Sequence, residues 1–103
     1  MSWYEYLAYF AAGALLVNGV PHFVNGISGR RFQSPFASPP GVGESPPLVN
    51  VLWGLVNFAG GFALIFGVGH FRFELNRPVM MVGLGGLVAS VLLALYFGRV
   101  RKG

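Results

Sequence analysis

The feature that most constrains this chain is a set of three long apolar stretches, at about residues 4–27, 48–70 and 78–98, within only 103 residues. At a rise of about 1.5 Å per residue, each stretch forms a helix of roughly 30 Å, which matches the hydrocarbon core of a bilayer. Charged residues make up 10% of the chain, well below the share in soluble domains. The sequence therefore predicts an all-α integral membrane protein, a single-domain bundle of three transmembrane helices whose first partner is the lipid bilayer.

The connection between the first two stretches, residues 28–47, is rich in proline and glycine. Each proline drives the preceding residue toward an extended conformation, so we expect a loop that contains neither a long helix nor a paired strand. Its length is typical of a lid or binding loop, and a polar tether between two helix ends is the alternative. Phe32 and Phe36 favour a loop that folds back onto the bundle or into the membrane interface, because exposed rings are costly in water. We expect Ser45 to cap the second helix.

The basic residues predict the orientation of the three spans. The N-terminus and residues 71–77 share one side of the membrane, and the long loop and the C-terminal tail share the other. Arg72 and Arg77 lie on the first side, whereas five basic residues lie on the second: Arg30, Arg31, Arg99, Arg101 and Lys102. The positive-inside rule then places the N-terminus outside and the long loop and tail in the cytoplasm. These five side chains either contact anionic lipid head groups or act only as topology determinants.

Polar residues inside the first two apolar stretches require partners, because an unpaired polar group in lipid costs several kcal/mol by order of magnitude. At about 100° per residue, Asn18, His22 and Asn25 share one face of the first helix, and Asn50 and Asn57 share one face of the second. Two antiparallel helices bring residues at the same depth in the membrane together, so we expect Asn18 to pair with Asn57. The same rule pairs Asn25 with Asn50 and places His22 between the two pairs.

This polar cluster has two interpretations. The amides can act as structural glue between helices, which is a common use of asparagine in membranes and is favoured for these asparagines. Alternatively, the cluster can line a polar path for a ligand or ion, with the imidazole of His22 relaying a proton or responding to pH. For His22 both interpretations stay open, because an amide would serve as glue without titrating.

The sequence predicts no metal, no cofactor and no catalytic residues. His22 and His70 lie near opposite ends of their spans, about 20 Å apart in depth, and the chain has no cysteine. No carboxylate lies inside a span, which argues against a carboxylate-coupled antiporter. No nucleophile–base pair or phosphate-binding loop is present. Nucleic-acid binding is excluded because the basic residues lie at the ends of apolar stretches instead of along one face.

Small residues recur at every fourth position along the second and third helices, a spacing that lets helix backbones approach closely in lipid. In the third helix these are Gly86, Ser90, Ala94 and Gly98, and in the second they are Ala59, Ala63 and Gly67. The short connection at residues 71–77 predicts that these two helices are antiparallel neighbours. The packing partner of the third helix, the second helix or another chain, stays open. Three short helices seldom enclose a cavity, which favours a homo-oligomer or a subunit of a larger membrane complex.

Three classes of function follow. The leading hypothesis is a small non-enzymatic membrane protein that acts as a homo-oligomer or accessory subunit, held by its asparagines and small residues. The alternative is a carrier or channel-like protein that binds a small molecule at the polar cluster around His22, with the long loop as a lid. A lipid- or quinone-directed enzyme with His22 as acid or base has the least support, because the spans supply no second catalytic group.

Overall fold

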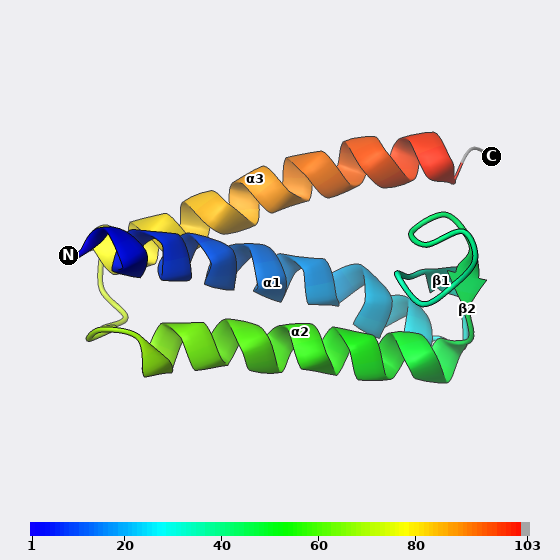
Figure 1. Cartoon of the computed structure of the whole chain (residues 1–103), viewed down its shortest axis with the longest axis horizontal. Helices are drawn as coiled ribbons and strands as arrows, with labels where there is room; N and C mark the ends of the chain where they lie inside the picture. The colour runs from blue at the N-terminus through cyan, green and yellow to red at the C-terminus, as the bar shows by residue number, and fades with distance from the viewer. Residues whose placement is uncertain (102–103) are drawn as a thin grey trace.

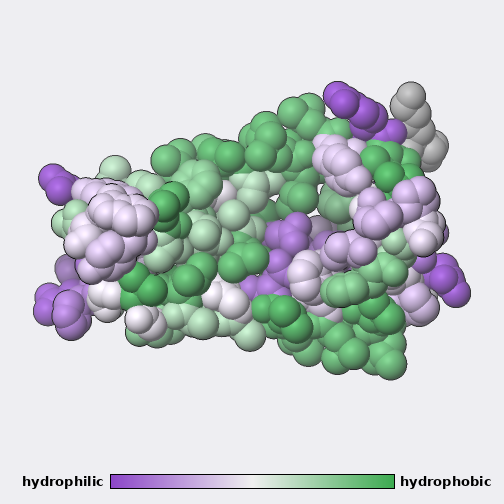
Figure 2. All heavy atoms as spheres, in the orientation of Figure 1, coloured by the Kyte–Doolittle hydropathy of each residue, from purple (hydrophilic) through white to green (hydrophobic). Residues whose placement is uncertain are grey.

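The structure, a computed structural model, describes residues 1–101 and is all-helical apart from one short hairpin and the connections. Its helices are α1 (Trp3–Ile27), α2 (Pro47–Gly67) and α3 (Arg77–Val100). Each is long and apolar enough to cross a membrane. Figure 2 shows hydrophobic surface along the middle of the molecule and hydrophilic atoms gathered toward both ends, as expected for an integral membrane protein. The predicted all-α fold with three helices of membrane-spanning length is confirmed.

Helix α1 lies between the other two helices (Figure 1). It packs extensively against α2 on one side and α3 on the other, and no comparable contact joins α2 to α3. The expectation that the short connection makes α2 and α3 direct neighbours is therefore wrong. The connection, residues 68–76, instead carries the chain past the N-terminal end of α1, and Gly69 there adopts a left-handed conformation with φ of 66°.

Glycines on two faces of α1 explain its central position. A Cβ atom built on Gly19 would lie 2.9 Å from the carbonyl oxygen of Gly54 in α2, so the backbones of these two helices are nearly in contact. On the opposite face, a Cβ on Gly13 would overlap a carbonyl oxygen of α3, and a Cβ on Gly85 would overlap the carbonyl oxygen of Phe10. In lipid, such close backbone approach is a main source of helix association.

The small-residue stripes noted in the sequence mostly face away from this packing. Gly86 lies against α1, where a Cβ would meet the Val17 side chain at 3.2 Å. The other members are exposed on the outer surface of the chain: Ser90, Ala94, Gly98, Ala59, Ala63 and Gly67. These residues therefore do not join helices within the chain, because each helix contacts α1 through a different face.

The connection between α1 and α2 folds back as a small hairpin. Strands β1 (Phe32–Gln33) and β2 (Glu44–Ser45) pair antiparallel, with Phe32 opposite Ser45. The expectation of an unpaired loop is wrong because the prolines between the strands lie in the turn, where they remove no ladder hydrogen bond. Ser45 also does not cap α2. It lies in β2, its hydroxyl bonds to that of Ser34, and Pro46 takes the cap position.

The hairpin lies in a gap between two diverging helices. Helix α1 continues through Pro21 to Ile27 and slopes toward α2 at its C-terminal end, while α3 diverges on the other side (Figure 1). Phe32, Gln33 and Ser34 are each at most 5% exposed, so the first strand of the hairpin and the residue after it are buried against the bundle, while most of the turn is exposed. The hairpin covers the end of the helices that carries the polar cluster.

Candidate functional site

His22 and Asn50 form the centre of the polar cluster. His22 comes from α1 and is 3% exposed, and Asn50 comes from α2 and is completely buried. The Nδ1 atom of His22 lies 2.8 Å from the Oδ1 atom of Asn50. The Nδ2 atom of Asn50 donates to the carbonyl oxygens of Phe32 and Ser45, each at 3.1 Å, and approaches that of Pro46 at 3.3 Å. One side chain thus joins α1, α2 and both strands of the hairpin.

These contacts determine which nitrogen of His22 carries a proton toward Asn50. Three backbone carbonyls surround one end of the Asn50 amide, so that end is the NH₂ group and the oxygen faces His22. His22 Nδ1 must then donate the hydrogen bond in either protonation state of the ring. The Nε2 atom is the position at which the ring gains or loses its proton.

The Nε2 atom of His22 has no hydrogen-bond partner among residues 1–101. In the same part of the chain, every fully buried side-chain nitrogen or oxygen has a partner. Nε2 is therefore accessible from the cavity that His22 lines. A nearly buried imidazole thus presents one free nitrogen to the cavity.

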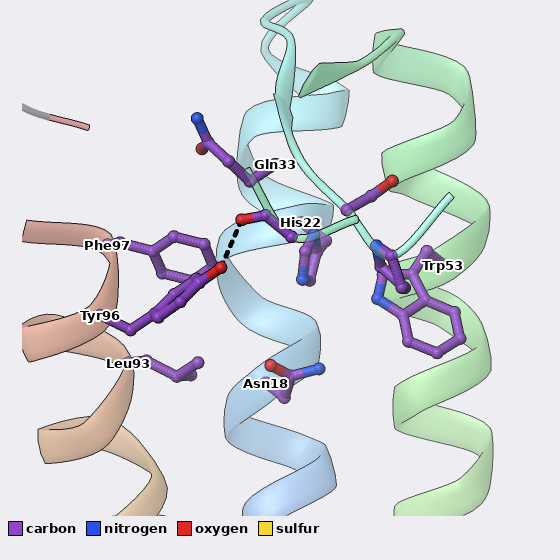
Figure 3. A pocket seen from close by; sticks show the side chains of 10 residues that line it. Asn18, His22, Gln33, Trp53, Leu93, Tyr96 and Phe97 are labelled. Carbon is purple, nitrogen blue, oxygen red and sulfur yellow. Dashed lines mark hydrogen bonds between the residues drawn. The ribbon is translucent and has the colours of Figure 1, made fainter. Parts of the chain in front are cut away.

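Asn18 and Asn57 form a second pair between α1 and α2. Asn57 is 2% exposed, and its Nδ2 atom donates to the carbonyl oxygen of Trp53 at 2.9 Å. Its oxygen accepts from Nδ2 of Asn18 at 2.9 Å. The oxygen of Asn18 then points away from α2 and toward α3, as Figure 3 shows, and has no partner among the described residues.

Asn25 does not join Asn50, so this expected pair is wrong. Its Nδ2 atom donates to the carbonyl oxygen of Pro21 at 2.8 Å, and its oxygen accepts from Nε of Arg30 at 3.0 Å. The hairpin explains the difference, because its carbonyls occupy the amide nitrogen of Asn50 and His22 occupies the oxygen. Asn25 instead ties the end of α1 to the first residues of the connection.

A cavity of about 220 Å³ lies between His22, the hairpin and α3 (Figure 3). Its lining combines polar groups with three aromatic rings and comes from all three helices and the hairpin: Asn18, His22, Gln33, Ser34, Pro35, Gly41, Trp53, Leu93, Tyr96 and Phe97. Two of these rings and one ring of the hairpin surround the imidazole of His22 edge-on, at centroid distances of 5.4 to 6.4 Å: Trp53, Phe97 and Phe32. The site is therefore largely apolar, with a few convergent polar atoms, which is typical of small-molecule sites.

Sequence reasoning missed the part of this lining that comes from the hairpin and α3. Gln33 and Ser34 gave no signal, because their burial depends on the fold of a proline-rich segment. Tyr96 and Phe97 lie near the end of α3, far from His22 in the sequence. No periodic pattern in the chain links them to His22.

Polar contacts hold the hairpin against α3. The hydroxyl of Tyr96 donates to the carbonyl oxygen of Gly41 at 2.7 Å (Figure 3). Arg101 donates to the side-chain oxygen of Gln33 at 2.7 Å and lies 3.4 Å from a carboxylate oxygen of Glu44. Its guanidinium also lies 4.6 Å from the ring centroid of Phe32, in cation–π geometry. These contacts hold the hairpin over the cavity at this end of the bundle.

The basic residues have different positions in the structure. Arg101 binds the hairpin and Arg30 binds Asn25, so these two guanidinium groups are partly committed within the chain. Arg31 and Arg99 are exposed at the same end of the molecule. Lys102 lies outside the described residues.

Residues 1–101 contain no group of three His, Cys, Asp or Glu side chains that could hold a metal. His22 lies beneath the hairpin, and His70 lies in the connection after α2, at the other end of the bundle (Figure 1).

Comparisons with protein-family models, with curated proteins and with solved structures found no match.

Proposed function

We propose that this small multi-pass membrane protein binds a small molecule in the cavity beneath the hairpin, as a carrier or channel-like binding protein. The observation that carries the proposal is the free Nε2 atom of His22 in a side chain that is 3% exposed. Nε2 is exposed to the cavity and is free to bond there, because the ring's other nitrogen is committed to Asn50. A ligand with a hydrogen-bond donor can therefore bond to Nε2 in the neutral ring.

The hydrogen bonding of the asparagines favours binding over adhesion between chains. The amides of Asn50 and Asn57 are satisfied within the chain, by His22, by Asn18 and by backbone carbonyls. They already hold α1, α2 and the hairpin together, so they are not free to join another subunit. Polar atoms that remain unpaired inside a membrane span mark ligand or ion pathways.

The hairpin serves as the lid of this site. It is attached to α3 by Tyr96 and Arg101 through contacts at the exposed edge, which water and lipid head groups can replace. The positive-inside rule places this end in the cytoplasm and the N-terminus outside, because Arg30, Arg31 and Arg99 lie here. Opening toward the cytoplasm would then expose the cavity to that side.

An enzymatic role has less support. Acid–base catalysis by His22 needs a second group within hydrogen-bond reach of the reacting atoms. The other titratable group in the lining, the hydroxyl of Tyr96, donates its proton to Gly41.

An accessory-subunit or homo-oligomer role is the second candidate, and one observation favours it. Ser90, Ala94 and Gly98 form an exposed small-residue stripe on α3, which lets another helix approach closely. The subunit count of the purified protein in mild detergent tests this candidate. A single subunit with no co-purifying protein contradicts it.

Leu93→Trp tests the binding proposal, with Leu95→Trp as the matched control. Leu93 lines the cavity, so an indole there fills it, whereas Leu95 is 64% exposed on the lipid-facing side of the same helix. The protein in phosphatidylcholine nanodiscs is heated with a panel of small hydroxyl, carbonyl and amide compounds. A ligand at a hundred times its Kd stabilises the folded state by about 2.7 kcal/mol.

We expect at least one compound to raise the melting temperature of the wild type and of Leu95→Trp but not of Leu93→Trp. The proposal fails if no compound stabilises the wild type, or if stabilisation survives in Leu93→Trp. Flux of the stabilising compound in proteoliposomes then separates a carrier from a receptor.

A further inference from the structure

A second cavity adjoins the first along the groove between α1 and α3. Its volume is about 300 Å³, and its lining is apolar except for Asn18: Ala14, Leu15, Asn18, Ala89, Leu92 and Leu93. Asn18 and Leu93 line both cavities, so the two spaces meet at these side chains. The combined space has a polar end under the hairpin and an apolar end along the helices.

The free polar atoms at the junction define the head group that fits. The oxygen of Asn18 can only accept a hydrogen bond, and Nε2 of His22 accepts one in the neutral ring. Both atoms lack partners among residues 1–101. The complementary head group is therefore a hydrogen-bond donor, and a hydroxyl supplies one without the cost of bringing a charge into the span.

The apolar end leads toward the centre of the bilayer. Ala14 lies one helical turn before Asn18, about 6 Å along the axis, close to the middle of α1. Ala89 is likewise near the middle of α3. Figure 2 shows hydrophilic atoms at the bottom of a hollow that is surrounded by hydrophobic surface on this face of the molecule. A ligand that leaves this groove enters lipid hydrocarbon.

We propose that the ligand is a single-chain amphipath with a hydroxyl head group, a long-chain alcohol in chemical class, that enters sideways from the bilayer between α1 and α3. Its hydroxyl donates to His22 or Asn18, and its chain follows the groove past Ala14 and Ala89. This inference rests on the proposed binding function. It adds the class of the ligand and its route of entry.

Photo-crosslinking tests this proposal. The probe is a hexadecanol analogue with a diazirine in the middle of its chain, incorporated into phosphatidylcholine nanodiscs with the intact protein. Ala89→Trp fills the apolar groove and leaves every hydrogen-bonding side chain of the site in the sequence. Ala94→Trp is the matched control, because Ala94 is exposed on the same helix and lines neither cavity.

We expect crosslinks at Leu15 and Leu92, competition by unlabelled hexadecanol, and no competition by hexadecane, which lacks the head group. Ala89→Trp should lower the yield by about tenfold, because the indole excludes the chain, and Ala94→Trp should not. Crosslinks spread evenly over the lipid-facing surface, or equal competition by hexadecane, would overturn the inference.

Butanol separates failure of this inference from failure of the proposed function. If butanol competes with the probe at Leu15 and Leu92 as well as hexadecanol does, and Ala89→Trp has no effect on either competition, the ligand needs no chain. The amphipath is then wrong and the binding function stands. If neither alcohol is held and Leu93→Trp changes nothing in the compound panel, both proposals fail.

Discussion

Replacing Asn50 by leucine should detach the hairpin from the helices. Asn50 is completely buried and joins His22 to backbone carbonyls of both strands. Leucine has a similar shape but neither donates nor accepts. The substitution therefore removes the hydrogen bonds at the centre of the site with little change in packing.

The expected loss of folding stability follows from the polar groups that the substitution leaves without partners. The Nδ1–H group of His22 keeps no partner, at a cost of about 1–3 kcal/mol, and two amide–carbonyl bonds of about 0.5–1.5 kcal/mol each disappear. Leucine regains little, because unfolded membrane helices stay in an apolar detergent phase. We expect a loss of about 3 kcal/mol in the free energy of unfolding, or roughly a hundredfold in the folding equilibrium.

Reversible unfolding by sodium dodecyl sulfate in mixed micelles measures this loss. Trp53 is a suitable reporter, because its ring centroid lies 6.4 Å from that of His22, and a Trp3→Phe background removes the other tryptophan. Asn25→Leu is the matched control, since Asn25 bonds only near the exposed end of α1. It should cost about 1 kcal/mol or less.

A double variant gives a further check on the reasoning. His22→Leu combined with Asn50→Leu leaves no unpaired N–H group, so it should be more stable than the sum of the two single losses by about 1 kcal/mol or more. If Asn50→Leu is no more destabilising than Asn25→Leu, and Trp53 fluorescence is unchanged, Asn50 does not hold the hairpin.

Two further predictions concern the packing of α1. A double-mutant cycle of Asn18→Leu and Asn57→Leu should give a coupling energy of about 0.6 to 1.7 kcal/mol in the same unfolding assay, and additive effects would contradict their 2.9 Å hydrogen bond. Gly85→Ala should destabilise the bundle by more than about 2 kcal/mol, because its methyl group would overlap the backbone of α1. The control Gly83→Ala places its methyl group where no atom lies within 4 Å, so it should change stability by less than about 0.5 kcal/mol. Equal effects of the two alanines would show that α3 does not pack on α1 through Gly85.

The helices could be predicted from sequence because span length and hydropathy are local properties. Helical periodicity and antiparallel depth also bring Asn18 opposite Asn57, and the structure has these two side chains in contact. The central position of α1 could not be predicted in the same way. It depends on Gly13 and Gly19, which lie on two faces of one helix. The short connection between α2 and α3 instead favours the wrong prediction that these two helices are neighbours.

The other half of the site depends on contacts between distant segments. Asn50 bonds to carbonyls of the hairpin, and no pattern in residues 28–47 indicates that its prolines lie in a turn between paired strands. The same fold buries Ser34 and brings Tyr96 to the cavity. Sequence reasoning therefore found the polar residues of α1 and α2 and expected the loop to fold back onto the bundle, but it missed the paired strands whose carbonyls bond to Asn50.

The state of the His22 ring tests the central claim most directly. Nitrogen NMR of isotope-labelled histidine in nanodiscs reports which ring nitrogen carries the proton. A His70→Gln background removes the other histidine, so that all signals come from His22. We expect a hydrogen-bonded proton on Nδ1 whose distinct signal disappears in Asn50→Leu. We also expect the Nε2 signal to shift when hexadecanol is added. A neutral ring with its proton on Nε2 and an unprotonated Nδ1 would contradict the arrangement on which the proposed binding site depends.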